Sequence, residues 1–348
     1  MNIFHSLQIQ NIIKETANAV SLVLDIPKSL KEEFRFTAGQ YINIKTTIDN
    51  KEVKRAYSIC STPNRGEIKI AIKAIENGTF SVYATSQLKD GDTLDVSLPE
   101  GKFVLNPENN KNYIAFAAGS GITPILSMVK ATLEENNSAK FYLIYGNKSE
   151  NDVIFKNELD SLKDRFSDRF NLHYIYSQQN ITDCLFGRID EENTNYFIKN
   201  IYSDVSFDSV FLCGPEGMIN TVSNTLQANG ILKENIFFEL FTTSSKEENT
   251  NQIKYGETVV TVLLDDEEIE FTMKQEDNLL TASLRNKVDA PYSCQGGVCS
   301  SCMAIVTKGK AVMTKNSVLT DEEIAEGLVL TCQAHPTTPK LFLDFDNV

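Results

Sequence analysis

Basic residues are scarce in this chain of 348 residues, which has 33 Lys and Arg against 47 Asp and Glu and a formal net charge of −14. Binding of nucleic acid requires a basic surface that neutralises phosphates, so this balance argues against a nucleic-acid partner. The seven cysteines are too few for a disulfide scaffold in a chain of this length. The three histidines, His5, His173 and His335, are isolated and do not have the spacing of a metal site.

The sequence also lacks the apolar segments of membrane and secreted proteins. The apolar stretch from Tyr113 to Ala118 is far too short to cross a bilayer. The first ten residues contain no basic stretch followed by an apolar run, so we expect no signal peptide. These features predict a cytoplasmic protein that does not bind a membrane.

The length is sufficient for two or three domains, and the pattern of the sequence changes twice along it. Residues 6–104 contain short strand-like segments separated by turn signals, which predicts a small antiparallel β-barrel. The predicted strands are Val20–Asp25, Tyr41–Lys45, Ile68–Ile75 and Thr93–Leu98.

Residues 111–241 alternate between short apolar strands and helical patterns, which predicts an α/β domain with a parallel sheet. The polar segment 242–252 contains no large apolar residue and is interpreted as a linker. A hairpin around 265–267 and a helix over Asn278–Lys287, with Asp277 as a possible N-cap, follow it. We therefore predict a multidomain protein with domains at 1–106, 107–242 and 253–348 and a linker at 243–252.

Four of the seven cysteines form one pattern near the C-terminus. Cys294, Cys299 and Cys302 have C-x4-C-x2-C spacing, and Cys332 lies farther along the chain. This is the plant-type spacing for a [2Fe–2S] cluster. Small residues within the loop, such as Gly296, let backbone N–H groups approach the sulfides. Zinc is the alternative, but its sites usually pair two C-x2-C units, and only one is present.

The segment from Pro291 to Cys302 resembles plant-type ferredoxins, whose fold is an α+β β-grasp. The resemblance covers about residues 253–348. It implies that the four cysteines are the ligands of a [2Fe–2S] cluster. Cys60 and Cys184, which lie outside the pattern, are interpreted as buried fillers.

A second resemblance lies in the first domain, where Arg55-Ala56-Tyr57-Ser58 ends a strand-like segment. With its flanking segments, this stretch resembles the flavin domain of the ferredoxin–NADP reductase superfamily. The resemblance implies that Arg55 binds the flavin phosphates, Tyr57 lies on the ring and Ser58 lies near N5. The alternative is a strand end with an exposed arginine and a half-buried tyrosine. The flanking segments are Gly39-Gln40-Tyr41, Lys73, Gly78-Thr79-Phe80-Ser81 and Pro99-Glu100-Gly101-Lys102-Phe103.

Two further segments resemble the nucleotide loops of the same superfamily. The stretch Ala117 to Pro124 follows a short strand and opens a helix, which is the context of a dinucleotide-binding turn. The second segment is Cys213-Gly214-Pro215, where Cys213 would lie near the nicotinamide; a buried, inert cysteine is the alternative. Glu239 either lies near the flavin or is solvated. The expected nucleotide-binding residues of the first segment are Gly119, Gly121, Thr123 and Pro124.

The choice between NADPH and NADH is not determined by the sequence. Relatives that select NADPH tend to carry Ser-Arg after a later strand, whereas this chain has Ser177 followed by Gln178. Lys148 could supply a substitute charge for the 2′-phosphate. We therefore expect NAD(P)H as the substrate.

The domain order resembles the reductase components of bacterial multicomponent oxygenases. Tyr145–Ser149 and Val153–Phe155 extend this resemblance to the reductase subunits of phenylacetyl-CoA epoxidases. The resemblance implies FAD rather than FMN, and an electron path from NAD(P)H through flavin and cluster to an oxygenase. Flavin is needed because NAD(P)H donates two electrons as hydride, whereas a [2Fe–2S] cluster accepts one. The alternatives are another acceptor, such as a Rieske oxygenase or a hybrid-cluster-type protein, and an iron–sulfur carrier without flavin.

Overall fold

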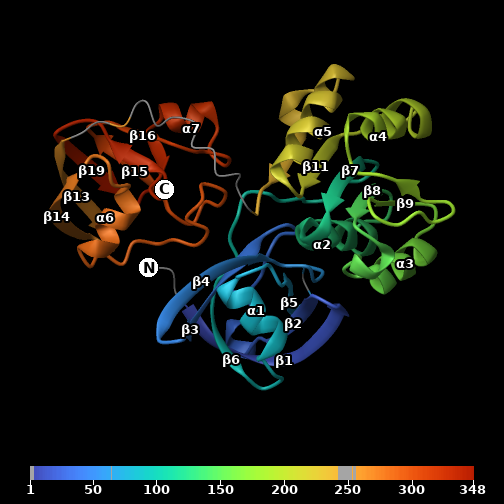
Figure 1. Cartoon of the computed structure of the whole chain (residues 1–348), viewed down its shortest axis with the longest axis horizontal. Helices are drawn as coiled ribbons and strands as arrows, with labels where there is room; N and C mark the ends of the chain where they lie inside the picture. The colour runs from blue at the N-terminus through green and yellow to red at the C-terminus, as the bar shows by residue number, and fades with distance from the viewer. Residues whose placement is uncertain (1–3, 64, 242–252, 254–255) are drawn as a thin grey trace. The chain divides into compact units, whose positions relative to one another are not determined.

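The structure is a computed structural model that describes residues 4–63, 65–241, 253 and 256–348. It divides into two compact units, Phe4–Glu239 and Leu240–Val348, which are treated separately (Figure 1). The predicted linker, residues 243–252, lies outside the described residues. In the described part of the chain, no helix is both long and apolar enough to cross a membrane.

The first unit begins with a six-stranded antiparallel sheet in the order β4-β3-β6-β1-β2-β5. An isolated bridge between Ile59 and Ile70 joins its two ends, so the sheet closes into the predicted barrel. Its interior is filled by side chains that alternate along the strands, including Leu7, Ile9 and Leu22. The elements are β1 (Phe4–Thr16), β2 (Ala19–Asp25), β3 (Tyr41–Ile48), β4 (Lys51–Ser58), β5 (Ile68–Lys73), α1 (Thr79–Ser86) and β6 (Thr93–Ser97).

A six-stranded parallel sheet follows, in the order β10-β9-β8-β7-β11-β12. The chain builds outward from β7 to β10 and then returns to add β11 on the other side of β7. The carboxyl ends of β7 and β11 therefore flank a switch point, where α/β proteins bind ligands. The strands are β7 (Asn112–Ala118), β8 (Lys140–Asn147), β9 (Phe170–Tyr176), β10 (Leu185–Phe186), β11 (Ser209–Cys213) and β12 (Ile236–Glu239).

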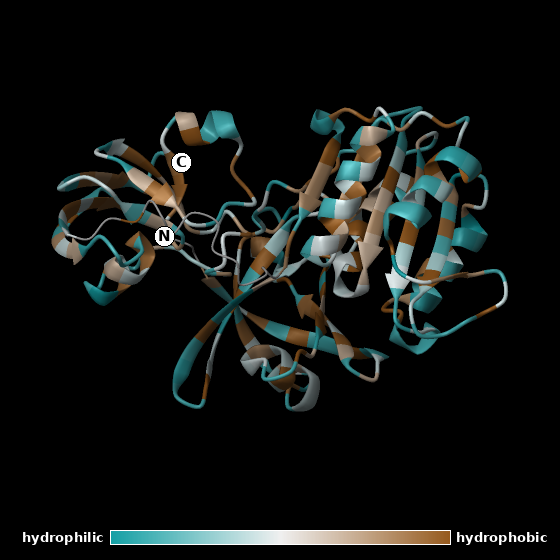
Figure 2. Cartoon of the chain, turned by 45° about the horizontal axis from the view of Figure 1, so that its top comes forward, coloured by the Kyte–Doolittle hydropathy of each residue, from teal (hydrophilic) through white to brown (hydrophobic). Residues whose placement is uncertain are grey.

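Helices cover both faces of the parallel sheet, with α2 and α3 on the face toward the barrel and α4 and α5 on the other (Figure 1). Hydrophobic and hydrophilic residues are mixed along the helices (Figure 2), and α3 and α5 each bury one face, whereas α2 is buried along nearly its whole length. Helix α3 begins only at Lys156, because the preceding Phe155 has a left-handed backbone with φ of 64°. The bounds are α2 (Ile122–Glu134), α3 (Lys156–Arg165), α4 (Glu191–Tyr196) and α5 (Glu216–Ala228).

One polar face of α2 joins the parallel sheet to the barrel. The Ser127 hydroxyl donates to the carbonyl oxygen of Ser61 at 2.8 Å, and Lys130 Nζ donates to that of Cys60 at 3.0 Å. Lys130 also lies 2.5 Å from the Glu158 carboxylate, which Lys69 of the barrel approaches to 3.5 Å. Because both lysines are buried, these contacts hold the barrel and the parallel sheet in one unit.

The second unit contains a mixed five-stranded sheet in the order β14-β13-β19-β15-β17, a small sheet of β16 and β18, and helix α6. This is the predicted α+β class. The predicted N-cap Asp277 is wrong: the Asn278 side chain accepts from the N–H of Thr281, while Asp277 pairs with Arg285. The elements are β13 (Glu257–Leu264), β14 (Glu267–Lys274), α6 (Leu279–Arg285), β15 (Met303–Lys308), β16 (Ala311–Met313), α7 (Asp321–Ala325), β17 (Leu328–Leu330), β18 (Ala334–Pro336) and β19 (Lys340–Asp344).

The tip of the β13–β14 hairpin is held by the end of the chain. Asp265 and Asp266 both have left-handed φ angles, 55° and 62°, as a tight two-residue hairpin turn requires. Their N–H groups donate to the two carboxylate oxygens of Asp346 at 2.8 and 2.9 Å. These hydrogen bonds lower the pKa of Asp346 and stabilise the turn.

Candidate active site and cluster site

The three residues considered for positions beside the flavin ring or the nicotinamide meet where the barrel touches the parallel sheet. Ser58 ends β4, and its hydroxyl lies 3.1 Å from a carboxylate oxygen of Glu239 at the end of β12. Cys213 ends β11 and is paired in register with Glu239 across the two parallel strands. A barrel strand and two sheet strands therefore bring a hydroxyl, a carboxyl and a thiol to one place.

The surroundings of this group keep it uncharged. Burial raises the pKa of Glu239 to about 8, although the hydrogen bond with Ser58 lowers it. Burial, followed by the nearby Glu239 carboxylate, raises the pKa of the fully buried Cys213 thiol. At neutral pH a neutral carboxyl can hold a proton beside Ser58, and Cys213 stays a thiol.

The expected flavin-binding residues lie around the end of β4 and the start of α1. Arg55 is exposed, and one of its guanidinium N–H groups donates to the carbonyl oxygen of Lys54 at 2.7 Å. The ring of Tyr57 lies 5.6 Å from that of Phe80, centre to centre, and burial raises the pKa of Tyr57. Ala56 is half-buried between Arg55 and Tyr57 in β4.

Helix α1 begins directly after Gly78, and its first residues, Thr79, Phe80 and Ser81, carry N–H groups without partners in the preceding turn. Gly78 provides no side-chain cap, and a Cβ there would lie 2.3 Å from Ser81 Oγ. The N–H groups at the start of α1 are therefore not covered by a capping side chain, and such helix starts are suited to bind phosphate. An exposed arginine, an aromatic ring and this helix start fit the phosphates and ring of a flavin nucleotide.

The first nucleotide loop is a short 3-10 turn, Gly119–Gly121, between β7 and α2. Gly119 has a φ of 55°, and Lys73 Nζ lies 3.7 Å from where its Cβ would be. A Cβ on Gly121 would lie 2.1 Å from the carbonyl oxygen of Cys213. The two predicted loops therefore touch backbone to backbone, and only glycine fits between them.

The neighbouring predicted residues shape these loops from within. Thr123 is buried, and its hydroxyl donates to the carbonyl oxygen of Ser120 at 3.0 Å. Pro124 is buried in the first turn of α2. A Cβ on Gly214 would lie 2.7 Å from Met218, and Pro215 precedes the first residue of α5. Thr123 and Pro124 thus fix the backbone of the turn through buried side chains.

The residues expected near a 2′-phosphate lie together at the ends of β8 and β9. The N–H of Gln178 donates to the carbonyl oxygen of Lys148 at 2.8 Å. The N–H of Ser177 donates to the carbonyl oxygen of Asn147 at 3.0 Å. Lys148 and Gln178 are therefore neighbours, so a cation at either position would serve the same site.

The four cluster cysteines converge in the second unit. The sulfur atoms of Cys294 and Cys299 are 3.1 Å apart, and the thiols of Cys294 and Cys302 both contact that of Cys332. The N–H of Gly296 donates to the Cys294 sulfur at 3.3 Å. Four converging thiols with an N–H donor fit the [2Fe–2S] ligand set.

The loop that carries these cysteines has a constrained backbone. Gly297 has a φ of 72°, and a Cβ there would lie 3.0 Å from the carbonyl oxygen of Lys315. The amide of Gln333 donates to the carbonyl oxygen of Gln295 at 3.1 Å. The buried Ser293 hydroxyl has no partner within the described protein, as expected beside a site that takes further atoms.

Two cysteines and one histidine outside these sites, Cys60, Cys184 and His173, pack against other residues of the first unit. Cys60 is buried, and burial raises the pKa of its thiol to about 12. Cys184 is only half-buried, so its interpretation as a buried filler is wrong. A ring nitrogen of His173 lies 2.6 Å from the Tyr202 hydroxyl.

Family models match the chain in three consecutive segments. Residues 6–105 match the oxidoreductase FAD-binding domain, and residues 116–224 match the oxidoreductase NAD-binding domain. Residues 262–337 match the 2Fe-2S iron-sulfur cluster binding domain. The three segments carry the flavin, nucleotide and cysteine sites, respectively.

Full-length relatives have the same organisation. The chain is 38% identical to one of the subunits of 1,2-phenylacetyl-CoA epoxidase from Escherichia coli K12, over 99% of both chains. It is 30% identical to the ferredoxin reductase component of 3-ketosteroid-9-alpha-monooxygenase from Rhodococcus rhodochrous, over 97% of this chain and 96% of the relative. The solved structure of phthalate dioxygenase reductase has the same fold, with a TM-score of 0.62, 24% identity and 98% of both chains covered.

Proposed function

The chain belongs to the family of flavin and [2Fe–2S] oxidoreductases that includes this 1,2-phenylacetyl-CoA epoxidase component, and from this we propose that it supplies electrons to an epoxidase of that type. It is an electron-transfer reductase with FAD-, NAD- and [2Fe–2S]-binding domains. The match to the FAD-binding model argues against the alternative of an iron–sulfur carrier without flavin. The observation that carries the choice of acceptor is the 38% identity over 99% of both chains.

The proposed residue roles follow from the positions of the side chains. FAD, when bound, takes up a hydride and releases its electrons singly, which suits a one-electron cluster. Arg55 and the N–H groups at the start of α1 would hold the phosphates of the flavin nucleotide. Lys73, which lies beside Gly119, would add positive charge where the two nucleotides approach.

The group at the ends of β4, β11 and β12 would control protons and water near the reacting atoms. Glu239 would hold a proton on its carboxyl group at neutral pH and share it with the hydroxyl of Ser58. The buried thiol of Cys213 would exclude water on the nicotinamide side. Both roles require the barrel and the sheet to stay in contact, as the polar face of α2 ensures.

The second unit would hold the cluster through the thiolates of Cys294, Cys299, Cys302 and Cys332. Free thiols that bind a cluster need a reducing compartment, which supports a cytoplasmic location for the reaction. The cofactor content gives a direct check: we expect about one FAD and about two irons per chain. Release of FMN alone from the purified protein would contradict the flavin assignment.

The acceptor is tested by reconstitution. The purified reductase is combined with the oxygenase subunits of a phenylacetyl-CoA epoxidase, phenylacetyl-CoA and NAD(P)H, and the epoxide is measured. A Rieske oxygenase and a hybrid-cluster protein serve as competing acceptors. We expect the reductase to support epoxide formation at a higher rate than it supports turnover of either competing acceptor. Faster turnover of a competitor than of the epoxidase would overturn the proposed acceptor. If cytochrome c is still reduced efficiently in that case, the conclusion that the chain is a reductase stands.

A further inference from the structure

Two buried hydroxyl groups hold the backbone of the Gly119–Gly121 turn from behind. The Tyr145 hydroxyl, from β8, donates to the carbonyl oxygen of Gly119 at 2.9 Å. The Thr123 hydroxyl, from α2, donates to the carbonyl oxygen of Ser120 at 3.0 Å. Two successive carbonyl groups of the turn are therefore directed into the protein.

Because the peptide bond is planar, the direction of each carbonyl group also fixes the direction of the N–H group that follows it. In a trans peptide the carbonyl oxygen and the following N–H point in opposite directions. A Gly119 carbonyl held toward Tyr145 turns the Ser120 N–H away from the sheet. In the same way, a Ser120 carbonyl held toward Thr123 turns the Gly121 N–H away from α2. Both N–H groups are thus presented where a helix start binds anions.

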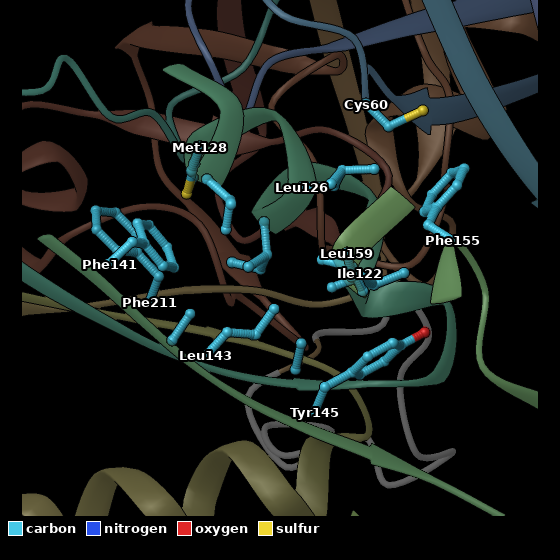
Figure 3. Packing of buried hydrophobic residues seen from close by; sticks show 14 of the residues in the cluster. Cys60, Ile122, Leu126, Met128, Phe141, Leu143, Tyr145, Phe155, Leu159 and Phe211 are labelled. Atoms are coloured by element: carbon cyan, nitrogen blue, oxygen red, sulfur yellow. The ribbon is translucent and has the colours of Figure 1, made fainter. Parts of the chain in front are cut away.

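Tyr145 is rigid enough to impose this orientation. Its side chain is fully buried beside Ile122 in the apolar cluster under α2 (Figure 3). Its hydroxyl also takes part in a hydrogen bond with the backbone of Ile154. Burial raises the pKa of this hydroxyl, so it remains a neutral donor.

We infer that Tyr145 is a positioning residue for the nicotinamide nucleotide, because its hydroxyl orients the N–H groups that receive the pyrophosphate. The inference rests on the proposed function, since it assumes that NAD(P)H binds at this turn. Tyr145 does not touch the nucleotide in this assignment. It acts through the peptide between Gly119 and Ser120, and its removal should affect binding more than turnover.

A second tyrosine in the same sheet provides a matched control. Tyr174 in the neighbouring strand β9 donates its hydroxyl to the Asp160 carboxylate at 2.9 Å. Replacing Tyr174 by Phe therefore removes the same group, with one partly buried hydrogen bond, without touching the turn. Both Tyr145→Phe and Tyr174→Phe delete a tyrosine hydroxyl, but only Tyr145→Phe removes a donor to the turn.

The test uses the FAD-loaded protein and NAD⁺ or NADP⁺ in calorimetric titrations, with thermal unfolding and steady-state kinetics alongside. Loss of the hydroxyl that donates to Gly119 in Tyr145→Phe should raise the Kd about three- to tenfold. The KM for the reduced nucleotide should rise by a similar factor while kcat changes little. Tyr174→Phe should keep the wild-type Kd. Unchanged binding in Tyr145→Phe, or equal weakening in both variants, would overturn the inference.

Thr123 offers a second pair of variants in case Tyr145→Phe does not fold. Thr123→Val removes the hydroxyl and should weaken nucleotide binding, whereas Thr123→Ser keeps it and should restore the wild-type Kd. Equal Kd values for the Thr123→Val and Thr123→Ser variants would contradict the inference that hydroxyl groups orient the turn. A wild-type protein that binds neither nucleotide would instead overturn the proposed function.

Discussion

The hydroxyl of Ser58 and the carboxyl group of Glu239 lie 3.1 Å apart although 181 positions separate them in the chain. This hydrogen bond links the end of a barrel strand to the last strand of the parallel sheet. It forms only when both parts of the first unit are folded and docked. The proposed reaction site is therefore a property of the docked pair and not of either part alone.

Replacing Glu239 by Gln should flatten the pH dependence of stability. The pKa of Glu239 is about 8 in the folded protein, against an ordinary value of 4.5. The folded protein thus keeps a proton that the unfolded chain has lost, and the free energy of unfolding falls as pH rises from 4.5 to 8. Chemical denaturation across this range should show a smaller fall for Glu239→Gln than for wild type. Identical slopes would contradict the raised pKa.

The Cys299→Ser variant should separate the two halves of the electron path. Loss of one of four thiolates removes or destabilises the cluster, so reduction of cytochrome c by NAD(P)H should fall sharply. Reduction of ferricyanide should survive, because it can accept electrons from the flavin. Cys184→Ser, which alters a half-buried cysteine outside the site, is the control and should keep both activities. Loss of both activities with FAD still bound would show that the assigned path is wrong.

Nucleotide preference should respond to Gln178 and Lys148, which are backbone neighbours. An arginine that binds the 2′-phosphate typically contributes about 1.5–3 kcal/mol, or roughly ten- to a hundredfold in affinity. Gln178→Arg should therefore shift the ratio of kcat/KM values toward NADPH, and Lys148→Ala should shift it toward NADH. A strong NADPH preference that neither substitution alters would place the 2′-phosphate site elsewhere.

The ion pairs between α2, α3 and the barrel should contribute measurably to stability. Glu158 pairs with Lys130 and Lys69. Burial alone would raise its pKa, but the two lysines outweigh burial and lower it. Glu158→Ala leaves Lys130 without its carboxylate and should reduce the free energy of unfolding by about 1–3 kcal/mol.

Glu150→Ala is the control for this effect in urea denaturation. Glu150 pairs with Lys156 at 3.3 Å on a more exposed surface. Its loss should therefore cost at most about 1 kcal/mol. Equal losses of unfolding free energy in Glu158→Ala and Glu150→Ala would show that the ion pairs between barrel and sheet stabilise the protein no more than an exposed ion pair does.

Local patterns were sufficient to predict the features that depend on neighbouring residues. The C-x4-C-x2-C spacing, together with Cys332, predicted four converging thiols. The four inner strands of the parallel sheet followed from their short apolar runs, whereas the outer strands β10 and β12 were not predicted. Strand β1 was not predicted, although its buried Leu7 and Ile9 alternate with the exposed Gln8 and Gln10, which is a strand signal that the sequence does contain. Helix α1 was not predicted either, since the sequence Thr79–Ser86 contains residues such as Val82 and Thr85 that do not favour helices.

Features that depend on strand order could not be read from the sequence. Tyr145 was part of a recognised segment, but its bond to Gly119 requires β8 to lie beside β7. The contact of Gly121 with Cys213 likewise requires β11 to return to the other side of β7. The left-handed backbone of Phe155 has no local signal, because bulky residues rarely adopt it.

The bond between the hairpin tip and Asp346 bears on how the protein is made. Strand β13 pairs in parallel with β19, so Val259–Leu263 depends on Lys340–Asp344 for one of its two neighbours. During synthesis the N-terminal part of a chain folds first. The barrel and parallel sheet can thus fold while the ribosome is still translating. The cysteine domain can complete its sheet only after Lys340–Asp344 has been synthesised, so its four cysteines can be held in place for a cluster only after the barrel and the parallel sheet have been made.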